Sequence, residues 1–150
     1  MHFRYFSFIK SECSIIMSVI CLSIFLVSCA APSNPDAEQA ASSAASEWLA
    51  LVDEGRYGES WQHASELFRV AVTKEQWESS LRGVRTPLGK LVSREVGTMQ
   101  YVEELPGAPD GQYVVIQFKT SLEFKKSAVE TVTPMIDKDG KWRVSGYYIK

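Results

Sequence analysis

From Asn34 onward, the hydrophobic pattern of this chain changes once, near Pro87 and Gly89, and the change limits the folds that the chain can adopt. Before these residues, apolar side chains recur with the 3.6-residue period of an amphipathic helix. After them, apolar and polar side chains alternate with the two-residue period of a half-buried strand. Helices and strands are therefore separated along the chain, which favours an α+β domain with N-terminal helices packed on a curved four-stranded antiparallel sheet.

Three helices are predicted in the first half of the chain. Asn34 is placed to cap the first helix, and Gly55 is placed to end it. The second helix is predicted over residues 57–70, where aromatic side chains follow the helical period. The third begins at a capping box, Thr73-Lys74-Glu75-Gln76, and is expected to end near Gly83.

Four strands follow, predicted over residues 91–103, 112–124, 128–137 and 141–149. The buried face of the second strand is expected to carry Val114, Ile116, Phe118, Leu122 and Phe124. Asp139-Gly140 is typical of a two-residue hairpin turn in which both residues have a positive φ. Such a sheet would curl around the first helix, and we expect the helices and the sheet to enclose a conical cavity lined by aromatic residues.

The start of the chain has the layout of a secretory signal peptide. Arg4 and Lys10 precede an uncharged apolar run over residues 15–27. This run is shorter than the roughly 20 residues that a helix needs to cross a bilayer. Residues 1–28 are therefore predicted to be a signal peptide.

The tetrapeptide Leu26-Val27-Ser28-Cys29 resembles the lipobox of bacterial lipoproteins. The resemblance implies that Cys29 is lipidated and becomes the mature N-terminus, and the alternative is a thiol in an uncleaved anchor. In Gram-negative lipoproteins, a residue such as Ala30 after the cysteine favours the outer membrane. We expect residues 29–35 to form a tether and residues 36–150 to form a single domain that faces the periplasm or the exterior.

Charge and cysteine content exclude several classes of protein. Cleavage before Cys29 would remove Cys13 and Cys21, so no disulfide or thiolate metal site is expected. The net charge of the whole chain is −2, and no basic stripe indicates nucleic-acid binding. Lys125-Lys126 is interpreted as a solvated turn, and Arg82 and Arg85 are interpreted as a solvated helix end.

Several motifs together span nearly all of the predicted mature chain. They are Trp48-Leu49, residues 52–57, Ser60-Trp61, Trp77, residues 85–89, Pro106-Gly107, residues 130–132 and residues 139–149. On these residues, the chain resembles the bacterial family called domain of unknown function 4019, within the nuclear transport factor two-like superfamily of cone-shaped folds. That superfamily includes dehydratases, isomerases, hydrolases, adaptor domains and inert ligand-binding cups, so the resemblance does not select an activity.

Few titratable residues are candidates for chemistry in a cavity. His63 is expected at a solvent-facing or boundary position, and Asp53 could act as a base or simply end the first helix. Glu130 is placed to form a cross-strand ion pair with Arg94. The strand tyrosines Tyr113, Tyr147 and Tyr148 are expected to pack their rings and leave their hydroxyls in water.

These observations favour a binding protein over an enzyme. The sequence contains no nucleophile elbow, no His-x-x-x-His pair and no phosphate-binding glycine loop, so no catalytic residue, metal or cofactor is assigned. We expect a membrane-anchored envelope lipoprotein whose domain binds a small apolar ligand or a protein partner without catalysis. The alternative is a hydrolase or isomerase-like enzyme in the cavity, and a homodimer formed through the exposed sheet face is compatible with either.

Overall fold

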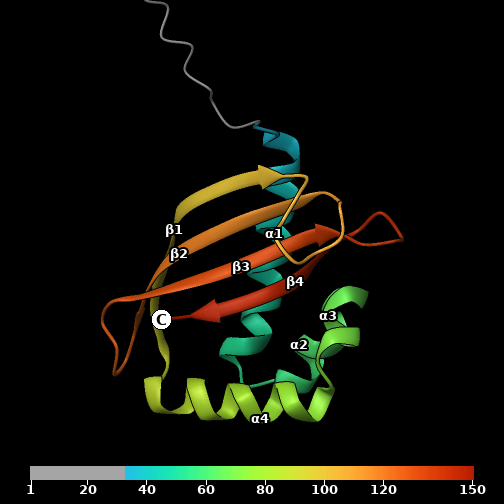
Figure 1. Ribbon diagram of the computed structural model, residues 1–150. Coiled ribbons are helices and arrows are strands. Elements are labelled where there is room, and N and C mark those ends of the chain that lie inside the picture. Colours follow the sequence, from blue (N-terminus) through green and yellow to red (C-terminus); the bar gives the residue numbers. More distant parts are fainter. Residues whose placement is uncertain (1–32) are drawn as a thin grey trace, which may run out of the picture.

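Helices precede strands in the structure, as the change of period predicts (Figure 1). This computed structural model describes residues 33–150, so the predicted signal peptide, Cys29 and most of the predicted tether lie outside the described residues. The helices are α1 (Pro35–Asp53), α2 (Tyr57–His63), α3 (Glu66–Ala71) and α4 (Lys74–Arg85), followed by the short 3₁₀ helix η1 (Thr86–Leu88). The strands are β1 (Leu91–Val102), β2 (Tyr113–Leu122), β3 (Ala128–Ile136) and β4 (Trp142–Ile149).

Helix α1 packs along one face of the sheet and contacts all four strands. It begins where the sequence predicts, because the Asn34 side chain accepts a hydrogen bond from the amide of Ala37 at 3.2 Å. Its buried stripe begins with small residues, which bring the helix axis close to the strands, and comprises Ala37, Ala41, Ala45, Trp48, Leu49 and Val52. None of the helices within residues 33–150 combines the length and the apolar content needed to cross a membrane.

The prediction of one helix over residues 57–70 is wrong, because the chain leaves the helix at Ala64 and Ser65 and then starts α3. The Ser65 hydroxyl caps α3 by accepting a hydrogen bond from the amide of Phe68 at 3.2 Å. The Ser65 amide donates to the carbonyl of Val144 in β4 at 2.9 Å, so the break also ties this segment to the edge of the sheet.

Helix α4 begins at the predicted capping box, in which Thr73 and Gln76 satisfy each other's backbone amides. It continues past Gly83 to Arg85, two residues beyond the expected end. Gly83 keeps a negative φ, and the chain changes direction at Gly89, whose φ of 75° an L side chain rarely adopts.

The four strands form an antiparallel sheet in the order β1-β2-β3-β4, which confirms the predicted meander. Val114, Ile116, Phe118 and Leu122 are buried as expected. Phe124 is not, because β2 ends at Leu122 and leaves its ring 72% exposed.

The turn between β3 and β4 differs from the predicted two-residue hairpin. The amide of Gly140 donates to the carbonyl of Asp137, and the amide of Asp137 donates to the carbonyl of Lys141, both at 2.9 Å. Only Gly140 of this loop has a positive φ, at 76°. The connection is therefore a longer loop built on a turn and a following glycine.

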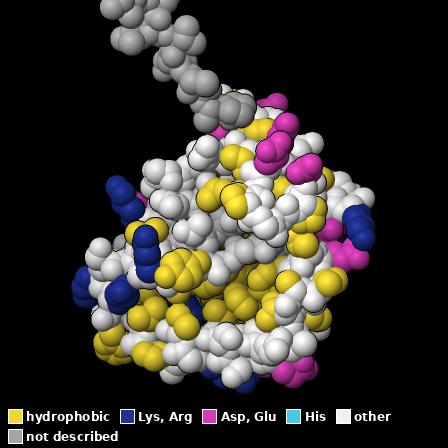
Figure 2. Space-filling view, in the orientation of Figure 1, with side chains coloured by type: hydrophobic (Ala, Val, Ile, Leu, Met, Phe, Trp, Pro, Cys, Tyr) yellow, Lys and Arg dark blue, Asp and Glu magenta, His cyan; other side chains and the backbone are white. Residues whose placement is uncertain are grey.

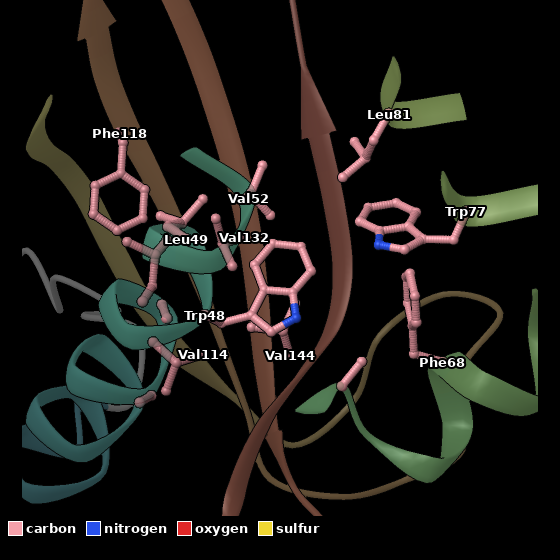
Figure 3. Packing of buried hydrophobic residues seen from close by; sticks show 14 of the residues in the cluster. Trp48, Leu49, Val52, Phe68, Trp77, Leu81, Val114, Phe118, Val132 and Val144 are labelled. Carbon is pink, nitrogen blue, oxygen red and sulfur yellow. The ribbon is translucent and has the colours of Figure 1, made fainter. Parts of the chain in front are cut away.

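Aromatic rings fill the space between the helices and the sheet, where we expected a conical cavity. Trp48 and Trp77 face each other across the core with ring centroids 5.8 Å apart, and Phe68 meets Trp77 edge to face at 4.9 Å (Figure 3). Tyr147 of β4 lies 5.5 Å from Trp48. Both indole N–H groups are satisfied, because Trp48 donates to the Ser60 carbonyl and Trp77 donates to the Ser60 hydroxyl.

The cap at Ser65 generates a prediction about stability. Ser65→Ala removes the hydroxyl that accepts from Phe68, and it should lower the free energy of unfolding by about 0.5–2 kcal/mol. Urea denaturation measures this change. Ser46→Ala is the matched control because Ser46 is exposed on α1, and it should change stability by no more than about 0.5 kcal/mol. Equal effects of the two substitutions would contradict the role of Ser65.

Candidate functional site

Four charged side chains meet between the end of α1, the end of α4 and the sheet. They are Asp53 of α1, Arg85 of α4, Arg94 of β1 and Glu130 of β3, and we refer to them as the ionic cluster. Arg85 is 4% exposed and Glu130 is fully buried. The two acids and two bases balance, so the cluster as a whole carries no net charge.

Arg94 joins the two acids of the cluster. Its Nη1 and Nη2 donate to the two carboxylate oxygens of Asp53 at 2.7 and 3.0 Å, and its Nε donates to Glu130 Oε2 at 2.6 Å. Arg85 Nη2 adds a hydrogen bond to Asp53 Oδ1 at 2.7 Å. The planar guanidinium of Arg94 suits this arrangement because its donors point along several fixed directions in one plane.

The Glu130 carboxylate is saturated with donors. Besides Arg94, the hydroxyls of Thr120 and Tyr147 each donate to it at 2.7 Å. Arg85 Nη1 lies 3.5 Å from Glu130 Oε1 and makes no other polar contact among the described residues. Strands β1, β2 and β4 and helix α4 thus each place a polar group around this carboxylate of β3.

These contacts determine the protonation state of Glu130. Burial alone would raise the pKa of Glu130, but hydrogen bonds and charge from Arg94, with hydrogen bonds from Tyr147 and Thr120, lower the pKa below the ordinary glutamate value. Burial, with the nearby negative charge of Glu130, raises the pKa of the Tyr147 hydroxyl. Near neutral pH, Glu130 is therefore a carboxylate and Tyr147 is a neutral donor.

The sequence predicts part of this cluster. The predicted ion pair between Arg94 and Glu130 is confirmed, and Asp53, which was considered as a base, is bound by both arginines. The interpretation of Arg85 as a solvated helix end is wrong. Arg85 continues the buried stripe of Trp77 and Leu81 at intervals of four residues, and this spacing was the signal that could have identified it.

The strand tyrosines differ in whether their hydroxyl groups are exposed or hydrogen-bonded within the protein. Tyr148 is 62% exposed, as expected, whereas the hydroxyls of Tyr147 and Tyr113 are bound inside the protein. Tyr147 donates to Glu130, and Tyr113 donates to the carbonyl of Pro109 at 2.7 Å. The expectation of a hydroxyl in water is therefore wrong for these two residues.

His63 lies apart from the ionic cluster, at an exposed position at the end of α2. It lines a groove of about 430 Å³ between α1 and β4, which we refer to as the α1/β4 groove. The apolar part of this groove is formed by Ala44, Trp48, Leu51, Trp142 and Val144, and its polar part is formed by Glu47, His63, Lys141 and Arg143. The structure thus does not bring His63 together with Asp53 and Glu130.

The ionic cluster is suited to holding α1 and α4 against the sheet. Each carboxylate of the ionic cluster already accepts from guanidinium groups, so neither is free to take a proton from a substrate. Within residues 33–150, no three His, Cys, Asp or Glu side chains are grouped so that they could hold a metal ion.

Glu130→Gln is predicted to lower the free energy of unfolding at pH 7 by about 3–5 kcal/mol, because Arg94 loses its buried counter-charge. Since folding lowers the pKa of Glu130, its contribution is present above the unfolded pKa of about 4.3 and is lost as the pH falls through the folded pKa. The gap between wild type and variant should therefore narrow below about pH 4.3.

Urea denaturation at several pH values measures this gap. Glu104→Gln, in the exposed loop after β1, is the control and should leave stability almost unchanged at all pH values. A gap between wild type and Glu130→Gln that stays constant on acidification would show that the ionised form of Glu130 does not stabilise the fold.

Comparison with known proteins identifies a family. A comparison with curated proteins finds no match. The family model described as "Protein of unknown function (DUF4019)" matches residues 44–147. This range contains all four residues of the ionic cluster. This match covers more than half of the chain, and the chain therefore belongs to the DUF4019 family.

Proposed function

We propose that this protein is a lipid-anchored protein of the bacterial cell envelope whose domain binds a small ligand without catalysis. We also propose that the domain belongs to the nuclear transport factor two-like superfamily, as a member whose interior is filled by aromatic side chains. The observation that supports a role without catalysis is that the carboxylates of Asp53 and Glu130 are bound by Arg85 and Arg94.

An enzyme in this fold would need a titratable group that substrate can reach. General acid–base catalysis works best when the pKa of the group lies near the working pH. Glu130 has neither property, because it is fully buried and its pKa is lowered. Asp53 has a side chain that is 17% exposed, but its carboxylate is bound on both oxygens by arginine. The ionic cluster therefore supports a structural role.

The α1/β4 groove is the better candidate for a binding site. Its volume of about 430 Å³ falls in the range of small-molecule sites. Aromatic rings of Trp48 and Trp142 offer apolar contact, and His63 and Lys141 offer polar contact at the same groove. A ligand with an apolar body matches this mixture.

Filling the α1/β4 groove should weaken ligand binding. Ala44 lines the groove, so the large side chain of Ala44→Trp would occupy its volume. With the fluorescent apolar probe anilinonaphthalene sulfonate, we expect Ala44→Trp to weaken binding at least about tenfold. Fluorescence titration measures the affinity.

The control places the same side chain on the same helix. Ala50 is exposed on α1 and does not line the groove, so Ala50→Trp should leave the affinity unchanged. Equal affinities of both variants and the wild type would place the probe elsewhere and refute the groove as the site.

The proposed anchor has its own test. Cys29→Ala removes the thiol that would carry lipid, so we expect no acylation and an accumulated precursor in place of the processed chain. Metabolic labelling with a fatty acid and the apparent mass of the protein measure these two outcomes. Cys21→Ala changes a thiol upstream of the predicted cleavage site and should be processed normally. Normal processing and membrane retention of Cys29→Ala would refute the proposed anchor.

A further inference from the structure

The charges of the domain are unequally distributed between the two ends of α1. Asp53 at the end of α1 contacts Arg94 near the start of β1, and Asn34 at the start of α1 lies close to Tyr101 near the end of β1. The first turn of α1 therefore lies at the end of the sheet where β1 finishes. Acidic side chains outnumber basic ones at this end, which we refer to as the acidic end. It carries Asp36, Glu38, Glu103, Glu104 and Asp110, and the turn between β3 and β4 at the same end adds Lys138 and Lys141 beside Asp137 and Asp139.

Lysines gather at the opposite end of the sheet. The Lys90 carbonyl accepts from the Glu123 amide at 2.9 Å, and the Leu88 carbonyl accepts from the Phe124 amide at 3.0 Å. These bonds place Lys90 beside the turn that carries Lys125 and Lys126. We refer to Lys90, Phe124, Lys125 and Lys126 as the lysine end. Figure 2 shows basic side chains at the side of the molecule where this turn lies and acidic side chains near the start of α1.

The lysine end combines positive charge with an exposed aromatic ring. Phe124 is 72% exposed next to Lys125 and Lys126, and Val92 nearby on β1 is 61% exposed. Glu123 is the neighbouring acid, so the three lysines leave this end positively charged. Exposed aromatic rings beside lysines suit the interface of a bilayer, where the ring enters the headgroup region and the lysines meet anionic lipids.

We infer that the lysine end binds the surface of an anionic membrane. The lysines supply attraction to anionic headgroups, and Phe124 supplies apolar area that is otherwise left in water. This binding is independent of the α1/β4 groove and of lipid on Cys29. It adds a second membrane contact to the proposed anchor.

The length of α1 determines how the domain would be oriented if both the proposed anchor and the lysine end contacted the membrane. The helix has 19 residues, which corresponds to about 28 Å between the acidic end and the ionic cluster beside the lysine end. A domain held at both ends would therefore lie with α1 along the membrane. This consequence for orientation rests on the proposed anchor, whereas binding by the lysine end does not.

The test uses residues 33–150, which carry the buried core cluster and the four-stranded sheet in one continuously packed unit. Co-sedimentation with phosphatidylglycerol vesicles measures the affinity, and phosphatidylcholine vesicles provide the uncharged comparison. We expect binding to the anionic vesicles alone. The double variant Lys125→Glu with Lys126→Glu should weaken this binding at least about tenfold, and added salt should weaken it as well.

A charge-matched control distinguishes the effect of the lysine end from the effect of a change in the net charge of the domain. Lys74→Glu with Lys138→Glu makes the same charge change at the start of α4 and in the turn between β3 and β4, away from the lysine end and outside the α1/β4 groove, and should leave binding almost unchanged. Equal losses in the two double variants, or equal binding to both vesicle types, would overturn the inference.

Phe124→Ser tests the insertion of the ring. It should weaken binding to the anionic vesicles but should not affect folding, because Phe124 is largely exposed. If soluble polyglutamate competed fully for the lysine end and Phe124→Ser bound vesicles as well as wild type, the site would recognise an acidic polymer and the inference of a membrane surface would fail.

Discussion

The Arg94 guanidinium is the contact on which the arrangement of this domain most depends, because it binds Asp53 of α1 and Glu130 of β3 at the same time. Burying charged groups costs free energy that only well-placed partners offset. Arg85 adds the end of α4, and Thr120 and Tyr147 add β2 and β4. A shift of α1, α4, β1 or β3 would separate a buried charge from a partner, and a shift of β2 or β4 would remove a hydroxyl donor from Glu130. The ionic cluster therefore constrains how α1 and α4 are placed on the sheet.

The same interaction constrains function. The ionic cluster uses two carboxylates, two guanidinium groups and a tyrosine hydroxyl, which are groups that an enzyme could use for proton transfer. Because they are bound to one another, the chemistry that remains accessible is at the surface. The aromatic rings of Trp48, Trp77 and Tyr147 fill the interior in a similar way. What the domain offers to other molecules is thus its grooves and its charged ends.

Local patterns predicted the elements of this fold well, because their causes lie within a few residues. The capping box at Thr73 and the alternation along β2 are of this kind. The break at Ser65 was missed because it depends on a hydrogen bond to Val144, far along the chain. The contacts of the ionic cluster join residues that are 32, 36 and 41 positions apart. The sequence predicted that Arg94 and Glu130 would form a cross-strand ion pair, but only the packing of α1 and α4 shows that Asp53 and Arg85 reach the same point.

The position of the α1/β4 groove links the binding and membrane proposals. The groove is lined by Ala44 and Leu51, in the second half of α1, so it begins roughly 14 Å from the end of the helix that would carry the proposed tether. In a domain held only by that tether, with α1 pointing away from the membrane, this distance would add to the length of the tether and keep the groove well above the lipid headgroups. In a domain held at both ends, the groove lies no further from the bilayer than the width of the domain. An apolar ligand taken from the membrane would therefore be accessible mainly in the second orientation, so the charges at the lysine end would control access to a groove that they do not touch.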